Sequence, residues 1–296
     1  MPRILVATDD GLQTIGGARA FADRSVTATA YNGPEFWAIV DRSEVWYAPA
    51  RDDWRRIATL EGHAATCIAF TDALHVGSSE ARWFRLTDGT LEPVAAFDDV
   101  DGRQDWYTPW GGPPDTRSIS EWGRDVYVNV HVGGILHTDD NGRSWTPTID
   151  IDADVHQVAT AEGLVLAACA GGLATSTDRG ATWTMRSGGL DAPYSRAVVV
   201  CGDVLLISAS NGPRGGRAAV YRGDLRGGRF ERCTGGLPGH FDDNIDSYCL
   251  DAVNDGSFAA FASSDGRLFG SEDVGSSWHE IASDMGVVHH VLVIPD

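Results

Sequence analysis

One short motif occurs three times in this chain, and such internal repetition limits the possible folds more than any other feature of the sequence. The pattern [ST]-x-D-x-G-x-[ST]-W begins at Thr138, at Ser176 and at Ser271. The residues before each copy also match, as GGILHT, GGLATS and GRLFGS. An eight-residue pattern with five fixed positions, repeated in phase with its flanks, predicts a fold built from repeated units.

Each residue type of the motif suits a tight turn between two strands. The Asp and the hydroxyl side chains can hydrogen-bond the turn backbone, and the Gly permits a positive φ. The Trp can start the next strand and pack between neighbouring sheets. A calcium loop is the alternative, but the EF-hand pattern needs a Gly and a distal Glu at spacings that this chain lacks. The Asp and Trp residues expected to have this structural role in the three turns are Asp140, Trp145, Asp178, Trp183, Asp273 and Trp278.

Weaker copies and strand-like runs fill the rest of the chain. Counting them gives units near residues 24–60, 63–97, 115–149, 154–190, 194–237 and 242–283, and a seventh from 287–296 with 3–21. Joining both termini in the last unit removes an exposed sheet edge. The spacing of about 42 residues fits a four-stranded blade. The sequence therefore predicts an all-β chain, residues 1–296 forming one seven-bladed β-propeller, with six blades as the alternative.

The motif resembles the Asp-box, or BNR, repeat of the sialidase-like propellers within the broad WD40, YVTN and BNR group. The resemblance covers about half of the chain. It implies that the Asp-box turns lie on one face of the propeller. Ligands are then expected at the other face, where the first strand of each blade begins. Members of this group have unrelated activities, so the resemblance alone assigns no function.

Charge and cysteine content narrow the partners and the compartment. The chain carries 42 acidic residues against 23 basic ones, all Arg, for a formal net charge of -19. Such a chain repels nucleic-acid phosphates and anionic membranes, so neither is expected as a partner. The five cysteines form no CxxC pair and favour buried thiols in a reducing compartment. Because the sequence shows no signal peptide and no spanning segment, we expect a cytoplasmic protein.

Candidate ligand residues come from aligning the units. The first strands should begin near Arg24, Thr66, Arg117, His156, Arg196, Ser247 and His289. Five of these seven are Arg or His, although the chain has few basic residues. The connecting loops add Trp110, Tyr194 and Asp246. Together they predict a polar, partly basic pocket in the central channel for an anionic or sugar-like ligand, because Arg binds carboxylate and phosphate in bidentate fashion.

A mononuclear divalent metal is a further hypothesis for the same channel. Its candidate ligands are His156, His289, His131 and His240, with Asp246 as an oxygen donor. The acidic run Asp150, Asp152 and Asp154 is expected to be a solvated loop rather than a metal site. The sequence identifies no other cofactor.

Two functions of different class stay open. The chain has no GxSxG, HExxH or P-loop motif. Three channel arginines resemble the sialidase triad, but Pro2–Leu5 does not match the sialidase Phe/Tyr-Arg-Ile-Pro motif, and we place no Tyr–Glu nucleophile pair. The leading hypothesis is a binding or scaffold module for a small ligand or a protein partner. The alternative is a hydrolase or lyase, glycosidase-like or metal-assisted, with no catalytic residue assigned.

Overall fold

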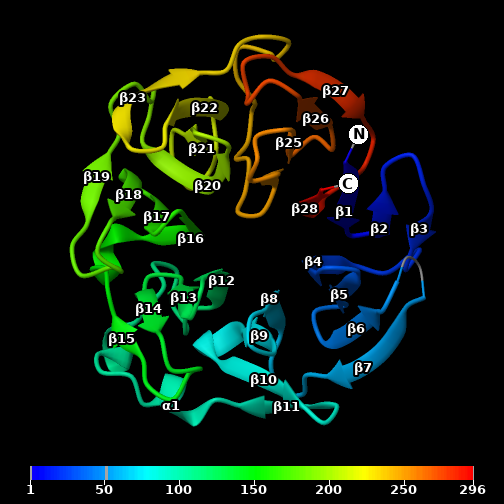
Figure 1. Cartoon of the computed structure of the whole chain (residues 1–296), viewed down its shortest axis with the longest axis vertical. Coiled ribbons are helices and arrows are strands. Elements are labelled where there is room, and N and C mark those ends of the chain that lie inside the picture. The colour runs from blue at the N-terminus through cyan, green and yellow to red at the C-terminus, as the bar shows by residue number, and fades with distance from the viewer. Residues whose placement is uncertain (1, 51–52, 296) are drawn as a thin grey trace. The chain divides into compact units, whose positions relative to one another are not determined.

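The structure, a computed structural model, describes residues 2–50 and 53–295. In this part of the chain, the strands form seven four-stranded antiparallel sheets (Figure 1). This confirms the predicted seven-bladed β-propeller, and the six-bladed alternative is wrong. The described helices are single turns: η1 (Ser79–Ala81), α1 (Ala95–Asp98), η2 (Arg103–Asp105) and η3 (Ile151–Ala153). None of them has the length and apolar character needed to cross a membrane.

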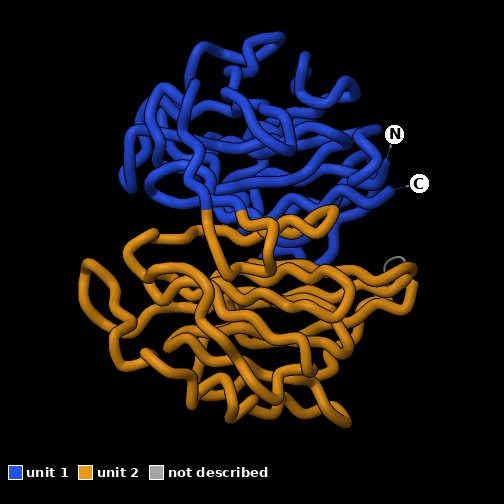
Figure 2. The backbone as a smooth tube through the Cα atoms, turned by 60° about the vertical axis from the view of Figure 1, so that its left-hand side comes forward, with its two compact units in different colours: residues 1–23, 166–175, 184–296 blue, residues 24–165, 176–183 orange. Residues whose placement is uncertain are grey.

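The chain divides into two compact units, coloured separately in Figure 2. Unit 2 comprises Arg24–Val165 and Ser176–Trp183, and unit 1 comprises the residues up to Asp23, Leu166–Thr175 and those from Thr184 onwards. The organisation as one domain therefore stays a prediction.

Unit 2 holds three complete sheets and the start of a fourth. The first consists of β4 (Val26–Asn32), β5 (Glu35–Val40), β6 (Glu44–Ala48) and β7 (Arg55–Thr59). The second consists of β8 (Ala65–Phe70), β9 (Leu74–Ser78), β10 (Trp83–Thr87) and β11 (Thr90–Pro93). The third consists of β12 (Thr116–Trp122), β13 (Asp125–Val130), β14 (Gly134–Thr138) and β15 (Thr146–Pro147). The fourth, whose strands are drawn from both units, consists of β16 (Val155–Ala161), β17 (Leu164–Cys169), β18 (Gly172–Ser176) and β19 (Thr184–Arg186).

Unit 1 holds the remaining three complete sheets. The fifth consists of β20 (Tyr194–Cys201), β21 (Val204–Ser210), β22 (Ala219–Asp224) and β23 (Gly227–Arg232). The sixth consists of β24 (Leu250–Ala252), β25 (Ala259–Ala262), β26 (Leu268–Ser271) and β27 (His279–Ala282). The seventh joins β28 (Val288–Ile294) to β1 (Arg3–Thr8), β2 (Gly11–Thr14) and β3 (Arg19–Ala20). Leu5 pairs with Leu292 and Val6 with Val291, so strands from the two ends of the chain complete one sheet, as predicted.

The core lies between neighbouring sheets of the same unit. In unit 2, Trp37 of β5 stacks on Phe70 of β8, with ring centroids 5.0 Å apart. In unit 1, Trp278 packs edge-on against Phe261 of β25 at 4.9 Å. Sheets covered on both faces explain why a middle strand such as β17, buried at every position, reads as a continuous apolar run.

The three repeated turns join the third and fourth strands of their sheets and share one hydrogen-bond pattern. Thr138 Oγ1 donates to Asp140 Oδ1 at 2.8 Å and accepts from the Gly142 N–H at 3.1 Å. Asp140 also accepts from the N–H and the hydroxyl of Ser144, and these bonds lower the pKa of Asp140 to about 2. The turns at Asp178 and Asp273 repeat these contacts. Gly142 has φ of 77°, which only glycine adopts at little steric cost.

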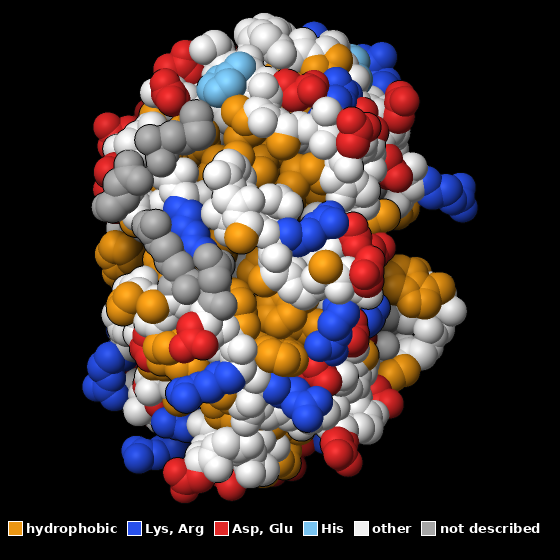
Figure 3. Space-filling model, turned by 90° about the vertical axis from the view of Figure 1, so that its right-hand side faces the viewer, with side chains coloured by type: hydrophobic (Ala, Val, Ile, Leu, Met, Phe, Trp, Pro, Cys, Tyr) orange, Lys and Arg blue, Asp and Glu red, His pale blue; other side chains and the backbone are white. Residues whose placement is uncertain are grey.

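Charged side chains of both signs are interspersed on the face drawn in Figure 3. Arginines in each unit pair with nearby carboxylates, as Arg82 does with Asp98 and Arg19 with Asp10. The five cysteines are all buried, and burial raises the pKa of the Cys67 thiol to about 12.

Candidate functional site

A β-bulge occurs near the start of several first strands. The register shifts between Ala65 and Cys67 in β8, and between Thr116 and Ser118 in β12. The extra residue, which has no pairing partner on the neighbouring strand, is Thr66 in β8, Arg117 in β12 and His289 in β28. A bulge bends its strand and redirects the side chain of the extra residue. Three of the residues that the sequence predicted to face the channel therefore lie at β-bulges, which redirect their side chains.

Three side chains meet in unit 2 at the end of β13 and the start of β16. His131 directly follows β13, Asp154 lies between η3 and β16, and His156 is the second residue of β16. Asp154 Oδ1 lies 3.3 Å from His131 Nε2 and 3.7 Å from His156 Nε2. The structure thus brings together two of the four predicted metal-binding histidines and adds an aspartate.

Local backbone contacts hold these residues in place. Asp154 has a left-handed φ of 48° and ends η3, where its N–H donates to the Ile151 carbonyl at 3.2 Å. The His131 N–H donates to the Asp115 carbonyl at 3.0 Å. Asn129 Nδ2 donates to the Val155 carbonyl at 3.1 Å, which ties the end of β13 to the start of β16. Because His131 and Asp154 are anchored through main-chain bonds, and the residue before His156 is bonded to Asn129, the position of the cluster is set by the fold.

The two histidines of the cluster are buried, and Asp154 between them is partly exposed. His156 is fully buried, and His131 is 4% exposed. Within the described residues, the buried Oδ1 atom of Asp154 has no hydrogen-bond partner. Contact with the His131 ring, and the charges of His156 and Arg117 nearby, lower the pKa of Asp154 although burial opposes this. Asp154 is therefore an ionised carboxylate facing two imidazoles.

Two exposed aromatic side chains border this cluster, both from the loop between η2 and β12. The Trp110 side chain is 71% exposed, and its ring centroid lies 5.0 Å from that of His131. Tyr107 is 45% exposed, and its hydroxyl donates to Asp152 Oδ1 at 3.4 Å. Large exposed aromatic faces beside a buried polar cluster are typical of a binding surface.

Arg196, Tyr194 and Asp246 form a second group of predicted residues, in unit 1. Arg196 forms an ion pair with Asp246 and lies over the ring of Tyr194, 5.5 Å from its centroid. Ser247 Oγ donates to the Arg196 carbonyl at 3.0 Å. Arg196 thus contacts both of the other predicted residues, Tyr194 and Asp246.

The other predicted residues contact aspartates or glutamates near them. Arg24 pairs with both Asp41 and Glu44 at 2.6 Å. In unit 1, His289 Nε2 lies 2.6 Å from Asp9 Oδ1, and His240 Nε2 lies 3.2 Å from Asp191 Oδ2. That all the predicted residues line one channel stays a prediction.

Sequence reasoning missed Asp154. Asp150 and Asp152 are exposed, as a solvated loop requires, but Asp154 turns toward the two histidines. The available signal was its place two residues before His156 at the start of a strand. Its pairing with His131 depends on contacts between sheets, which local sequence does not encode.

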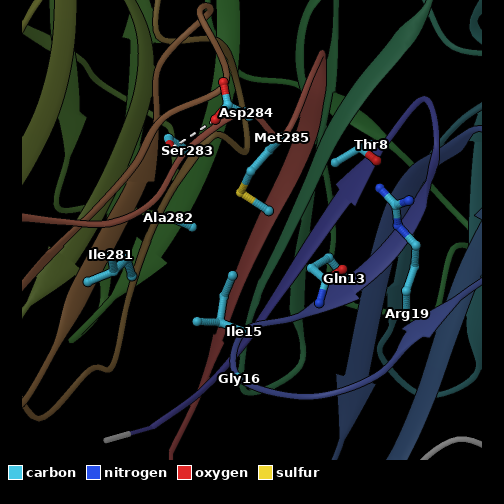
Figure 4. A pocket seen from close by; sticks show the side chains of 10 residues that line it. All are labelled: Thr8, Gln13, Ile15, Gly16, Arg19, Ile281, Ala282, Ser283, Asp284 and Met285. Atoms are coloured by element: carbon cyan, nitrogen blue, oxygen red, sulfur yellow. Dashed lines mark hydrogen bonds between the residues drawn. The ribbon is translucent and has the colours of Figure 1, made fainter.

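A pocket of about 280 Å³ lies elsewhere, in unit 1 (Figure 4). Residues of β1 to β3 line one side, and β27 with the loop after it lines the other. Several of its polar groups already bond residues close to them in the sequence, since Thr8 Oγ1 donates to the Gly11 carbonyl and Arg19 forms an ion pair with Asp10. The pocket therefore lacks the converging polar groups that the His131 cluster has.

Comparison with known proteins supports the fold class. No protein-family model matches the chain, and no curated protein matches it. Among solved structures, the chain is similar to YCF48 bound to D1 peptide, with 13% identity, a TM-score of 0.64 and coverage of 100% of this chain and 98% of that one. It is also similar to YCF48 from Cyanidioschyzon merolae, with 14% identity, a TM-score of 0.60 and coverage of 88% and 87%. A GH74 xyloglucanase from Xanthomonas campestris matches with 16% identity and a TM-score of 0.64, over 87% of this chain and 47% of the enzyme. At these identities the likeness shows a β-propeller fold alone.

Proposed function

We propose that this protein is a binding propeller of the Asp-box type that holds a small anionic, sugar-like ligand at the cluster of His131, Asp154 and His156. The Asp-box assignment is supported by the common hydrogen-bond pattern of the turns at Asp140, Asp178 and Asp273. We also propose that nucleic acid is not a partner, in keeping with the net charge of -19, and that the location is cytoplasmic, in keeping with five buried free cysteines.

The observation that carries the proposed ligand is the exposed Trp110 ring against the buried His131 ring. An aromatic face packs well against the apolar face of a sugar ring. Arg117, whose charge acts on Asp154, supplies a cationic donor for a carboxylate on the same ligand. Neighbours of this fold include a protein named as a xyloglucanase and one bound to a peptide, so a carbohydrate and a protein partner are both compatible with the fold.

Isothermal titration calorimetry tests the proposal with two probes, oligogalacturonate as the acidic sugar and cello-oligosaccharide as the neutral one. We expect the acidic probe to bind more tightly. Trp110→Ala should weaken that binding about tenfold or more, a loss of roughly 1.4 kcal/mol. The matched control is Trp122→Ala, which removes another exposed tryptophan of unit 2 (47% exposed) and should bind as the wild type does. Binding of neither probe, or binding unchanged by Trp110→Ala, would exclude this function.

A metal-assisted hydrolase or lyase is the second candidate, and the His–Asp–His cluster favours it. Two imidazole nitrogens and one carboxylate oxygen in one cluster are typical of metal sites that activate water. Incubating the acidic probe with the protein and measuring new reducing ends or an unsaturated product tests this. Product formation that Asp154→Asn abolishes would favour an enzyme over a binding module.

A further inference from the structure

We propose that His131, Asp154 and His156 bind one divalent transition-metal ion, for which zinc is the probe. The ion would also offer an open coordination position to the carboxylate of the ligand. In that respect the inference rests on the proposed function, although metal binding itself is measured without any ligand.

The distances in the cluster suit a small ion. One ligand atom from each side chain lies within 4.8 Å of the other two. Tetrahedral zinc with bonds of about 2.0–2.2 Å holds neighbouring ligand atoms roughly 3.3–3.5 Å apart. The His131–Asp154 and His156–Asp154 separations of 3.3 and 3.7 Å match this closely. The nitrogen atoms of the two imidazoles also lie within 4.8 Å of each other.

The donor set selects the class of metal. Imidazole nitrogen suits zinc, copper, iron and nickel, whereas calcium and magnesium prefer oxygen ligands. Two imidazoles and one carboxylate therefore exclude the alkaline-earth ions as the preferred occupants. Three protein ligands also leave a position for water or an exogenous oxygen, which is typical of open rather than structural zinc sites.

The surroundings of Asp154 Oδ1 are a further observation in favour of an ion, since His131 Nε2 lies 3.3 Å away without forming a hydrogen bond of acceptable geometry. Buried polar atoms are nearly always hydrogen-bonded, because a buried polar atom without a partner destabilises the folded state. Asp154 Oδ1 is such an atom among the described residues, and it points toward two imidazoles that are almost fully buried. A cation between the three groups would neutralise the carboxylate and satisfy this oxygen.

Other histidines of the protein provide the contrast. His137 Nε2 lies 2.6 Å from Asp125 Oδ1, and His75 Nε2 lies 3.1 Å from Asp72 Oδ1. In each of these pairs the histidine and the aspartate are joined by a direct hydrogen bond. In the part of the chain that the structure describes, His131, Asp154 and His156 are the one group of three or more such side chains that could hold an ion.

Zinc binding to untagged protein, stripped with chelator and titrated in a calorimeter, tests the site. We expect one ion per chain and a melting temperature that zinc raises and chelator restores. H131Q and H156Q should each weaken binding at least about tenfold, a loss of roughly 1.4 kcal/mol. H137Q, which alters a histidine of the same unit paired with one aspartate, should bind zinc as the wild type does.

Cobalt provides a readout that does not depend on the variants folding. Cobalt in the wild-type protein should give the intense visible bands of a four-coordinate site, and excess zinc should remove them. Failure to bind one zinc ion, or binding that H131Q and H156Q leave intact, would overturn the metal site. Loss of binding in H137Q as well would also overturn it.

The two proposals fail separately. Oligogalacturonate binding that persists in chelator, in a protein that takes up no zinc, would overturn the metal site and leave the ligand site standing. Zinc binding at one equivalent without any affinity for the acidic sugar would support the metal site and exclude the proposed ligand.

Discussion

Asp140, Asp154 and Asp251 show how different environments set the charge of one residue type. Turn hydrogen bonds lower the pKa of Asp140 to about 2, and contact with the His131 ring lowers that of Asp154. Asp251 lies in β24 and accepts a bond of 2.7 Å from the Val293 N–H, but burial raises its pKa to about 7. The first two are therefore stabilising as anions, and Asp251 is stabilising in its protonated form.

The pKa of Asp251 predicts a pH dependence of stability. Since its folded value of about 7 lies above the ordinary value, its contribution is complete below about pH 4 and is lost as the pH rises through about 7. We expect Asp251→Asn to raise the melting temperature at pH 8 and to leave it nearly unchanged at pH 4. Asp203→Asn, at an exposed position of the same unit, is the control. Equal effects at both pH values would contradict the assignment.

At the residue scale, the sequence predicted the kinds of side chain in the site but not their grouping. His131 and His156 were predicted together with His289 and His240, which instead contact Asp9 and Asp191 in unit 1. Ligands that come from different sheets have no fixed spacing in the sequence. Their grouping depends on packing between sheets, so the pairing of Asp154 with His131 was missed.

At the element scale, the repeated turn is the feature that the sequence predicted best. Its hydrogen bonds join residues within eight positions of one another, so the motif itself encodes the contacts. The bulges at Thr66 and Arg117 were not predicted, because a bulge is a relation between two strands. Local hydrogen bonding is thus readable from the sequence, and register between strands is not.

The tryptophan of a repeated turn should contribute strongly to stability. Trp278 is 4% exposed, packs on Phe261 at 4.9 Å, and donates to the Gly275 carbonyl at 3.1 Å. We expect Trp278→Ala to lower the free energy of unfolding by about 3–5 kcal/mol, measured by urea denaturation. Met185→Ala, at a site 47% exposed, should change it by less than about 0.5 kcal/mol. A loss below about 1 kcal/mol at Trp278 would show that the turn does not depend on this packing.

At the scale of the whole molecule, the pairing of β28 with β1 completes the seventh sheet. This was predictable because counting the repeats left two terminal segments that each read as part of a blade. The division into two compact units was not predicted, since every unit of the repeat has the same local pattern. Comparing the repeats therefore predicts the number of sheets but not how the sheets divide between the two compact units.

Removal of β28 tests the role of the seventh sheet. Deleting the residues from Val288 onwards takes away buried Val291 and Val293 and leaves the edge of β1 unpaired. We expect loss of the cooperative thermal transition and aggregation in size-exclusion chromatography. Pro295→Ala, at an exposed position after the strand, should behave as the wild type does. A truncated protein that melts cooperatively at the wild-type temperature would contradict this role.

The measurement that tests the metal site most directly is anomalous diffraction at the zinc absorption edge, from crystals grown with stoichiometric zinc. We predict one strong peak between His131 Nε2, Asp154 Oδ1 and His156 Nε2, at bonding distance from each and absent after chelation. A map without a peak there, in which the three side chains hydrogen-bond one another directly, would contradict the metal site.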